Sequence, residues 1–226
     1  MIHSRYAVWE NRARELAVTL SPGRQVHVQG VVETCERLCR RFGEHVERGR
    51  VAAWIHDLAR EWPAQRLLRQ AEAFGIMTDE VEREMPVLLH GQVIAAWVRQ
   101  EWGVDDIEIL QAVGNHTTGR PGMGRLETIL YVADAIEPGR SYDGVERLRR
   151  LAGEDLEQAA LAVSDSTMHY LLNAGMLLHP RTLLTRNDLW RRVRGRSLTR
   201  GWQGAWKETG NDRPGGEVGP EGCRGS

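Results

Sequence analysis

Hydrophobic residues recur along this chain with the spacing of three or four residues that is typical of α-helices. Val31, Cys35, Leu38 and Phe42 lie on one face of such a helix, and Gly43 marks its end. An earlier helix precedes it, and a Ser-Pro-Gly turn separates the two. Further helices are expected approximately over residues 46–60, 63–74, 86–102, 105–115, 124–137 and 154–174. Because alternating period-two patterns are nearly absent, the sequence predicts an all-α fold.

The composition of the chain changes near residue 195. A chain of 226 residues is long enough for one domain of ordinary size. The stretch from Gly210 to Ser226 is rich in glycine, contains two prolines and has almost nothing to bury. We therefore expect one domain over residues 1–194 and a disordered Gly/Pro-rich tail over residues 195–226.

Charge and hydropathy exclude several classes of protein. Lys and Arg total 30 against 31 for Asp and Glu, which argues against a broad face for nucleic acid but leaves a local basic pocket possible. No run of about 18 apolar residues occurs, so we expect no transmembrane helix. The first residues lack the uncharged stretch of a signal peptide. A cytoplasmic protein without a nucleic-acid or membrane partner is therefore expected.

The three cysteines do not predict a disulfide. Cys35 and Cys39 lie four residues apart on the predicted helix, where a disulfide would be awkward, and Cys223 lies in the tail. A metal site with two thiolates at 35 and 39 is one interpretation. Buried free thiols are the interpretation that the apolar face favours.

Four of the eight histidines fall on or beside apolar helical faces, namely His27, His56, His90 and His116. Asp57 follows His56 directly, and Asp134 interrupts an apolar run over residues 129–133. An ionised carboxylate in such surroundings is costly unless a positive charge compensates it. One buried metal ion would compensate both aspartates and would use neutral imidazoles as ligands. Four histidines in mixed or polar surroundings keep a structural interpretation: His3, His45, His169 and His179.

Each of these residues also has an ordinary explanation. A single histidine on an apolar face is usually a hydrogen-bonded core residue, and a buried aspartate is often satisfied by an arginine or a helix N-terminus. Six such residues together favour a metal site. Histidine and aspartate suit iron, manganese, zinc or magnesium, and the lack of usable thiolates argues against a structural zinc site.

The ordered set of histidines and aspartates resembles that of the HD-domain metal-dependent phosphohydrolases. An HD dipeptide alone arises often by chance, whereas the full ordered set on helices is specific. The flanking sequence resembles the YqeK-like branch of symmetrical bis(5′-nucleosyl)-tetraphosphatases, which cleave diadenosine tetraphosphate into two ADP. This likeness covers about residues 20–190. It rests on Arg24-x-x-His27, His90-Gly91, His116-Thr117-Thr118-Gly119, Met123 and the run from Tyr131 to Arg140.

The resemblance implies an HD-domain helical bundle around a buried metal site. In that family the first two histidines, the HD aspartate and the last aspartate bind one ion, which here gives His27, His56, Asp57 and Asp134. His90 and His116 would hold a second ion bridged by Asp57, or donate hydrogen bonds to phosphate, so Asp57, His90 and His116 are the candidate catalytic residues. We expect one or two ions, with iron favoured and manganese or magnesium as alternatives. The core four should converge within ~5 Å of one point, given ligand bonds of ~2 Å.

The same resemblance implies a small-molecule partner, a dinucleoside polyphosphate, and leaves a homodimer possible. Arg60 stands where the branch usually has lysine, so a planar guanidinium replaces an ammonium and phosphate geometry would change. The candidate substrate contacts are Arg24, Asp57, Arg60, His90, His116, Thr117, Thr118 and Arg140.

Hydrolysis of a polyphosphate at neutral pH needs charge neutralisation and a ready nucleophile. A metal ion provides both, since it lowers the pKa of bound water from 15.7 towards ~7 and polarises the phosphoryl group. Two alternatives share the same residues. Another HD-type nucleotide phosphohydrolase, such as a nucleoside monophosphate phosphatase, would differ in the pocket around the threonines, and a non-catalytic nucleotide-sensing module would bind without turnover.

Overall fold

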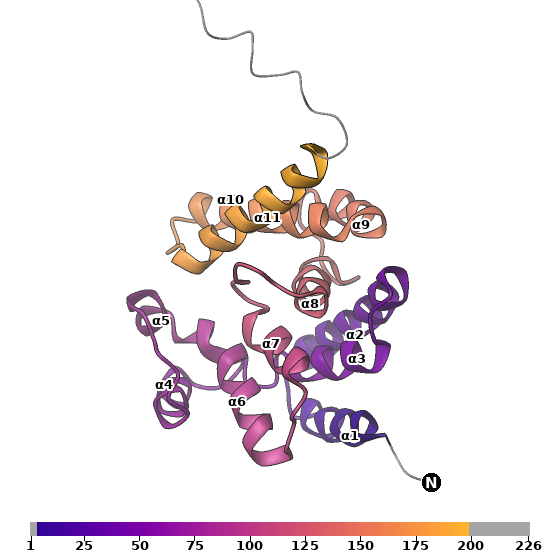
Figure 1. Cartoon of the computed structure of the whole chain (residues 1–226). Helices are drawn as coiled ribbons and strands as arrows, with labels where there is room; N and C mark the ends of the chain where they lie inside the picture. Colours follow the sequence, from indigo (N-terminus) through magenta and orange to yellow (C-terminus); the bar gives the residue numbers. More distant parts are fainter. Residues whose placement is uncertain (1–3, 199–226) are drawn as a thin grey trace, which may run out of the picture.

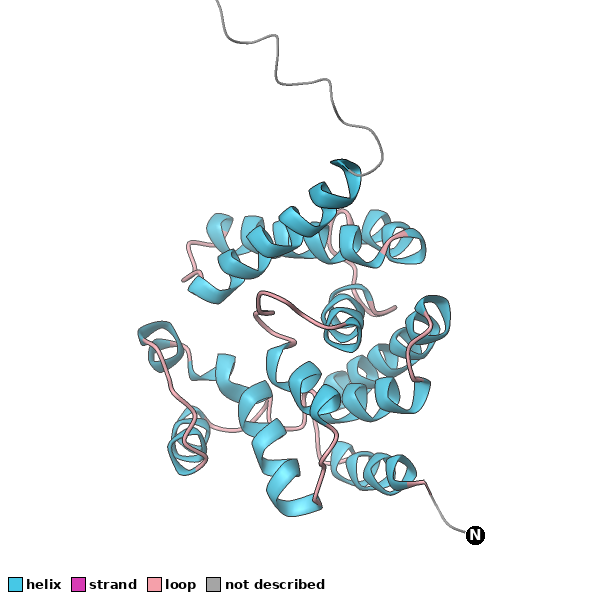
Figure 2. Ribbon diagram, viewed as in Figure 1, coloured by secondary structure: helices cyan, strands magenta, loops and turns pink. Residues whose placement is uncertain are grey.

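The computed structural model describes residues 4–198, which form helices joined by loops and contain no strand (Figure 2). The all-α prediction is therefore confirmed. Over this range the elements are α1 (Arg5–Ala17), α2 (Pro22–Phe42), α3 (Val46–Ile55), α4 (Ala64–Ala73), α5 (Glu80–Glu84), the 3₁₀ helix η1 (Pro86–Leu89), α6 (His90–Trp102), α7 (Ile107–Asn115), α8 (Arg125–Ile136), α9 (Val145–Glu154), α10 (Leu156–Asn173) and α11 (Pro180–Leu198).

Local sequence signals set the ends of α2, the helix that carries the first candidate ligand. The Ser21 hydroxyl accepts a hydrogen bond from the Arg24 backbone N–H at 3.4 Å, and Pro22 occupies the first helical position. Gly43 ends the helix in the left-handed region, with φ +66°. Between these ends the apolar face of α2 is buried, and His27 lies on it.

Helix α8 lies at the centre of the fold (Figure 1). It packs against α2, α7 and α10, and nearly all its side chains are buried between Leu126 and Ile136. A helix that is apolar on all sides belongs inside a core. Helices α9, α10 and α11 form a layer on one side of α8, while α1 to α7 lie on the other side (Figure 1). The last turn of this central helix carries Asp134.

Two predicted helices differ from the observed ones near the candidate ligands. The helix expected over 46–60 ends at Ile55, because residues 56–60 form tight turns with bonds such as Arg60 N–H to Asp57 O at 2.9 Å. The helix expected over 86–102 is divided into η1 and α6. Pro86 supplies no N–H and its ring fixes φ, which suits the first residue of a short 3₁₀ turn. His90 then begins α6.

Helices α5, α9 and α11 were not predicted from the apolar pattern. The reason is clearest in α11, which buries Thr182, Thr185 and Leu189 while Leu183 and Leu184 remain exposed. Its buried face therefore mixes threonines with leucine and lacks the continuous apolar stripe of an ordinary amphipathic helix. Helix α11 extends past residue 194 to Leu198, and the remainder of the predicted tail, residues 199–226, lies outside the described residues.

Among residues 4–198, no helix combines the length and the apolar character needed to cross a membrane.

Candidate metal centre

Five helices bring one of their ends to a common point. His27 lies in the second turn of α2, His90 is the first residue of α6, and Asp134 lies in the last turn of α8. The other three candidate ligands directly follow a helix: His56 and Asp57 follow α3, and His116 follows α7. The structure thus brings together all six residues that the sequence singled out. All are buried except Asp134, whose side chain is 25% exposed.

Asp57 lies between two pairs of histidines. Its Oδ2 atom is 3.5 Å from His27 Nε2 and 3.6 Å from His56 Nε2. Its Oδ1 atom is 3.0 Å from His90 Nε2 and 3.7 Å from His116 Nε2. One carboxylate therefore faces both halves of the cluster, which is the arrangement that a ligand bridging two ions requires.

Hydrogen bonds at Nδ1 orient all four histidines in the same way. In His56, His90 and His116, Nδ1 lies 2.6, 2.6 and 2.8 Å from the carbonyl oxygen three residues earlier. In His27, Nδ1 lies 3.2 Å from a carboxylate oxygen of Glu137. Because each partner is an acceptor, each neutral ring carries its proton on Nδ1. The four Nε2 lone pairs therefore point into the cluster.

The lone pairs show that the cluster fits a cation. Nε2 of His27 and Nε2 of His56 are buried and have no hydrogen-bond partner. Nε2 of His90 lies 3.0 Å from Nε2 of His116, so two acceptors face each other there. A positive charge between these atoms removes the repulsion, and a divalent metal ion can be shared by several of them. Potential ligand atoms of His27, His56 and Asp134 lie within 4.8 Å of one another, as do those of His56, Asp57 and His116.

The electrostatics of the cluster favour ionised carboxylates and a neutral His56. Burial alone would raise the pKa of Asp57 and Asp134, but the surrounding imidazoles outweigh it and hold both pKa values below the usual range. Burial lowers the pKa of His56 to about 4. At neutral pH these three side chains are thus in the protonation states that metal ligation requires.

For two of the other imidazoles, those of His27 and His116, the pKa is raised. Burial opposes the charged form of His27 and His116, but Asp134 beside His27 and Asp57 beside His116 outweigh it and raise both pKa values. For His90 burial dominates, and its pKa is lowered. Protons therefore compete with a metal ion mainly at His27 and His116.

Two of the three candidate phosphate-binding arginines contact the ligand carboxylates. Arg24 Nη1 donates to Asp57 Oδ2 at 2.6 Å. Arg140 donates to Asp134 twice, from Nη2 to Oδ1 at 2.8 Å and from Nε to the backbone oxygen at 3.0 Å. Arg60 lies on the turn after Asp57, half-buried, and its side chain makes no hydrogen bond or ion pair within residues 4–198.

The loop after α7 places its two threonines differently. Thr117 Oγ1 lies 3.3 Å from His116 Nε2, at the edge of the cluster. Thr118 is buried and donates to the carbonyl oxygen of Gly119. Its own carbonyl accepts a hydrogen bond from the Thr185 hydroxyl at 3.1 Å, so α11 holds this loop in place.

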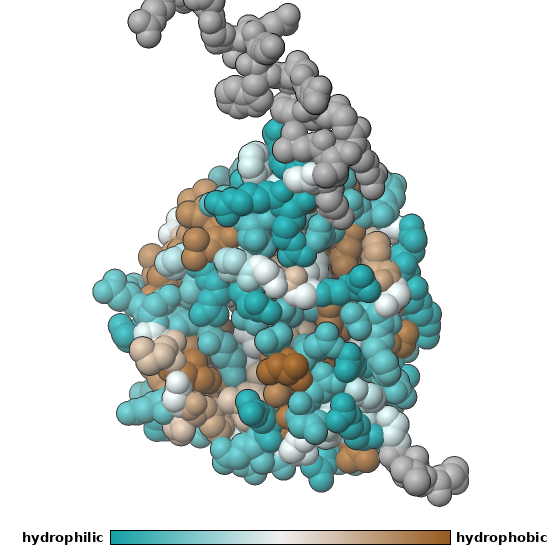
Figure 3. Space-filling view, viewed as in Figure 1, coloured by the Kyte–Doolittle hydropathy of each residue, from teal (hydrophilic) through white to brown (hydrophobic). Residues whose placement is uncertain are grey.

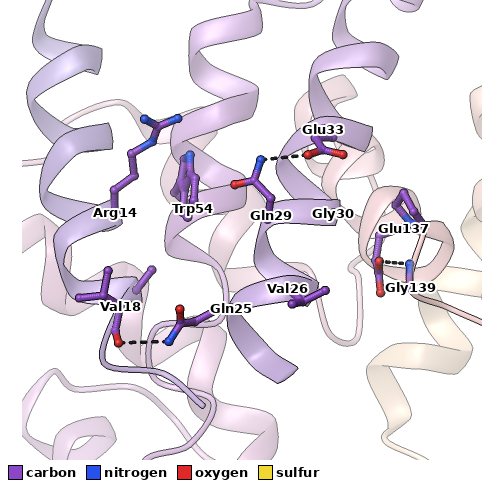
Figure 4. A pocket seen from close by; sticks show the side chains of 12 residues that line it. Arg14, Val18, Gln25, Val26, Gln29, Gly30, Glu33, Trp54, Glu137 and Gly139 are labelled. Carbon is purple, nitrogen blue, oxygen red and sulfur yellow. Dashed lines mark hydrogen bonds between the residues drawn. The ribbon is translucent and has the colours of Figure 1, made fainter. Parts of the chain in front are cut away.

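Glu137 is a residue of this centre that the sequence analysis did not assign. Its buried carboxylate accepts from His27 Nδ1 and from the Gly139 backbone N–H. A Cβ atom at Gly30 would lie 2.6 Å from Glu137 Oε2, so the glycine leaves room for the carboxylate. The same side chain lines a groove of about 660 Å³ beside Trp54 (Figure 4). The signal was its position, one helical turn after Asp134.

Gly91 explains how the second pair of histidines meets. A Cβ atom at Gly91 would lie 2.7 Å from the Val113 carbonyl oxygen and 3.0 Å from the His116 ring. Only glycine allows the start of α6 to approach the end of α7 this closely. The short distance between His90 and His116 therefore depends on the absence of a side chain at Gly91.

A third group with metal-ligand chemistry lies away from the cluster. His179 is buried, and its Nε2 lies 3.1 Å from Asp79 Oδ2 and 3.6 Å from Glu82 Oε1. Its Nδ1 accepts from the Arg181 backbone N–H at 3.0 Å, so the neutral ring carries its proton on Nε2. This Nε2 offers no lone pair to an ion, which agrees with the structural interpretation of His179.

None of the remaining candidates within residues 4–198 belongs to a group of converging ligand atoms. Cys35 and Cys39 are buried free thiols, and burial raises the pKa of Cys39 to about 12, so its side chain stays a thiol at neutral pH. His169 binds the Asp165 backbone oxygen in an exposed position. His3 lies outside the described residues.

Comparison with known proteins agrees with this geometry. The HD-domain sequence pattern matches residues 24–139. The chain is 39% identical to "Bis(5′-nucleosyl)-tetraphosphatase, symmetrical" of Bacillus subtilis over 182 residues, covering 79% of this chain and 97% of the relative. The protein of the same name from Halalkalibacterium halodurans is 35% identical over 182 residues, which again cover 79% of this chain and 97% of the relative. A crystal structure of a "predicted HD superfamily hydrolase involved in NAD metabolism" from Clostridium acetobutylicum superimposes with a TM-score of 0.78 at 35% identity, covering 80% of this chain and 97% of that one. This chain therefore belongs to the HD-domain family, in the group that contains these symmetrical tetraphosphatases.

Proposed function

We propose that this protein is a metal-dependent hydrolase that cleaves diadenosine tetraphosphate and related dinucleoside polyphosphates symmetrically, giving two ADP from the former. The names of its relatives in Bacillus subtilis and Halalkalibacterium halodurans support the reaction. The observation that carries the proposal is the position of Asp57 between two pairs of histidines whose Nε2 lone pairs face inward. We place this activity in the cytoplasm, with a small nucleotide as the only partner that the reaction needs.

The core ion would be held by His27, His56, Asp57 and Asp134. A second ion would be held by His90 and His116 together with Asp57, or these two imidazoles would instead contact phosphate. Iron suits a mixed set of imidazoles and carboxylates, and manganese or magnesium are the alternatives. When bound, such an ion activates water and polarises the phosphoryl group that is attacked.

The side chains of this protein would then orient the substrate. Arg24 and Arg140 neutralise the ligand carboxylates, so in the loaded enzyme their guanidinium groups become available to phosphate, which they can bind in two-pronged fashion. Arg60 has no competing partner among the described residues. Of the two threonines, Thr117 is the better candidate for a phosphate contact, because the Thr118 hydroxyl is already bonded to Gly119.

Symmetrical cleavage requires that one ADP half of the substrate is held in place, because this determines which phosphorus is attacked. If Arg24, Arg140 and Thr117 hold one ADP half, water attacks the terminal phosphorus of that half. The bridging P–O bond breaks, and the other ADP departs with the bond electrons. Asp57, which faces both histidine pairs, would hold the ion or ions beside the phosphorus that is attacked.

Product analysis tests this reaction directly. Diadenosine tetraphosphate and a panel of nucleoside monophosphates are incubated with the enzyme, with and without a chelator, and the products are separated by ion-exchange chromatography. We expect ADP as the only nucleotide product, and none after chelation. Equal AMP and ATP would contradict symmetrical cleavage, and activity confined to monophosphates would favour the alternative phosphatase. Binding without turnover would indicate a sensing module.

Asp57→Ala tests the site that the proposal uses. We expect it to lose both bound metal and activity, because Asp57 is the carboxylate shared by both histidine pairs. Asp143→Ala is the matched control, since Asp143 is an exposed aspartate on the loop before α9. Full metal content and turnover in Asp57→Ala would mean that the site is wrongly assigned.

A further inference from the structure

An arginine that lies over a tryptophan ring stands out on the surface near the metal centre. The guanidinium carbon of Arg66 is 3.5 Å from the ring centroid of Trp62, whereas the other cation–π contacts within residues 4–198 measure 4.9 to 5.6 Å. At 3.5 Å the two groups are in van der Waals contact. Arg66 is exposed, and its side chain makes no hydrogen bond or ion pair with any described residue. One face of this cation is therefore packed on Trp62 and the other is open. We call the pair the Trp62–Arg66 stack.

The segment that leads to the stack begins at a candidate metal ligand. At one end, Asp57 Oδ1 lies 3.0 Å from Nε2 of His90, the first residue of α6. At the other end, the ring centroids of Trp62 and Trp97 are 6.5 Å apart. His90 and Trp97 are seven residues apart, so they lie on the same face of α6 and about 10 Å from each other along its axis. Residues 57–62 therefore run along α6 from the metal centre to the stack.

The same segment borders the open side of the metal centre. Arg24, whose side chain is 26% exposed, reaches Asp57 from the start of α2. Glu61 accepts hydrogen bonds from the backbone N–H and the hydroxyl of Ser21, which caps the same helix. Arg60 precedes Glu61 and has no side-chain partner among the described residues. Because Trp62 follows Glu61 directly, the stack lies on the rim of this opening.

We propose that the purine base of the departing half of the dinucleotide stacks on the open face of Arg66, an inference that rests on the proposed hydrolase function. Bases stack on guanidinium planes as they do on aromatic rings. The separation of about 10 Å along α6 is comparable to the span of one nucleoside diphosphate from its terminal phosphate to its base. Arg60 lies between the two ends, where the phosphates of this half would pass. The Trp62–Arg66 stack is thus a specificity determinant for substrates that carry a second base.

The surface around α4 suits one base better than a longer nucleic acid. Figure 3 shows hydrophilic and hydrophobic side chains intermixed at the lower left, where Figure 1 places α4. A nucleic acid requires a continuous basic face along its backbone, whereas one base requires only one stacking surface. Trp62 already supports the Arg66 guanidinium, so a base that stacks there has less side-chain freedom to remove.

A comparison of two substrates tests the stack. Diadenosine tetraphosphate carries the second base, and adenosine 5′-tetraphosphate has the same phosphate chain without it. We expect Arg66→Ala to raise KM for diadenosine tetraphosphate by about tenfold, the size of effect that one stacked base gives, and to leave KM for adenosine 5′-tetraphosphate unchanged. Arg66→Lys should resemble Arg66→Ala, because an ammonium keeps the charge but offers no planar surface. The matched control is Arg12→Ala, since Arg12 is an exposed arginine on α1 whose side chain also has no hydrogen bond or ion pair within residues 4–198.

Binding without turnover separates the stack from the hydrolase reaction. Titration calorimetry of both substrates in the presence of a chelator gives their Kd values, and Arg66→Ala should weaken the binding of diadenosine tetraphosphate alone, by about tenfold. Equal KM and Kd values in wild type and Arg66→Ala overturn the stack, and hydrolysis by both proteins leaves the proposed function intact. Weaker binding in Arg66→Ala, together with a wild-type protein that hydrolyses neither substrate, keeps the stack and rejects the hydrolase. An equal loss on both substrates, or full activity in Arg66→Lys, would show that Arg66 contributes only charge or structure, and either result overturns the proposal.

Discussion

At the scale of single residues, each candidate histidine ligand is oriented by a hydrogen bond at Nδ1, the ring nitrogen that does not face the cluster. Three of the four histidines are held at Nδ1 by a backbone carbonyl of their own helix or turn. His27 is the exception, because its partner is the carboxylate of Glu137, which is 110 residues away in the sequence. A carboxylate behind a ligating histidine fixes the ring and raises its basicity. Glu137 is therefore a positioning residue for the core ion.

Replacing Glu137 should weaken metal binding without removing a ligand. We expect Glu137→Ala to lower the affinity for Mn²⁺ about 10- to 100-fold, and Glu137→Gln to lower it less, because an amide oxygen still accepts from His27 Nδ1. Titration calorimetry measures both. Glu33→Ala is the control, since Glu33 lines the same groove but is exposed and bonded to Gln29 (Figure 4). Unchanged affinity in Glu137→Ala would show that His27 needs no such support.

The pKa shifts predict that metal binding releases protons. The pKa values of His27 and His116 are raised above 6.5, so part of each ring is protonated near neutral pH in the metal-free protein. A metal needs the neutral ring, so its affinity should rise with pH across this range, by up to about tenfold per pH unit for each proton displaced. His56 contributes nothing there, because its pKa is about 4.

Calorimetry of Mn²⁺ binding in PIPES and in Tris measures this release, since the two buffers take up protons with different heats. We expect proton release at pH 7 that disappears well above the pKa values of both rings. Affinity that stays constant between pH 6 and pH 8 would show that both rings are already neutral in the metal-free protein.

The candidate metal ligands could be predicted from the sequence, whereas the side chains that orient them could not. Asp57 and Asp134 stand out because an ionised carboxylate inside an apolar run must be compensated, and that argument needs no coordinates. Glu137 sits among Ile136, Pro138 and Gly139 as a charged residue at a helix end, which is ordinary on a surface. Only the packing of α2 against α8 shows that this carboxylate is buried.

At the scale of elements, the second pair of histidines depends on how closely two helices approach. His90 begins α6 and His116 follows the last residue of α7. Gly91 lies at this contact, and a methyl group there would fall 2.7 Å from the Val113 carbonyl oxygen. Backbone atoms cannot yield as a flexible side chain can, so a larger residue must push the two helices apart.

Two glycines of these helices should respond to alanine in opposite directions. We expect Gly91→Ala to destabilise the fold by about 1–3 kcal/mol through overpacking and to weaken binding at His90 and His116. Gly114→Ala in α7 should be neutral or stabilising by up to about 1 kcal/mol, because its Cβ meets nothing closer than 3.9 Å and alanine favours the helix. Urea unfolding measures both. Equal stabilities of the two variants would mean that α6 and α7 adjust freely.

The helices that could be predicted are those with an ordinary apolar stripe. α2, α6 and α8 bury their apolar faces, so the spacing of hydrophobic residues located them to within a few positions. Helix α11 could not be found in this way, because its buried face includes Thr182 and Thr185 while Leu183 and Leu184 are exposed. Its position follows instead from contacts with distant segments, such as Thr185 with Thr118.

At the scale of the whole molecule, the metal centre is a junction between elements that are far apart in the sequence. Its candidate ligands come from the ends of α2, α3, α6, α7 and α8: the core ion would join α2, α3 and α8, and a second ion would connect α6 and α7 to them. Helix α8 also carries the layer of α9, α10 and α11 on its other side (Figure 1). Without an ion, the inward-facing lone pairs of His90 and His116 oppose the closed arrangement.

Removal of the metal should therefore lower the melting temperature of the entire domain. A ligand present at about 100 times its Kd stabilises the folded state by about 2.7 kcal/mol. In a domain of this size each kcal/mol corresponds to about 2–4 °C, so chelation should lower Tm by about 5–10 °C. Differential scanning calorimetry with and without a chelator measures the shift, and readdition of Mn²⁺ should restore it. Asp57→Ala is the decisive control: because it lacks the carboxylate that both histidine pairs share, its Tm should not respond to chelator. A wild-type Tm that ignores the chelator would mean that this cluster holds its shape without an ion, and the repulsion between the facing imidazoles would then have to be relieved by a proton.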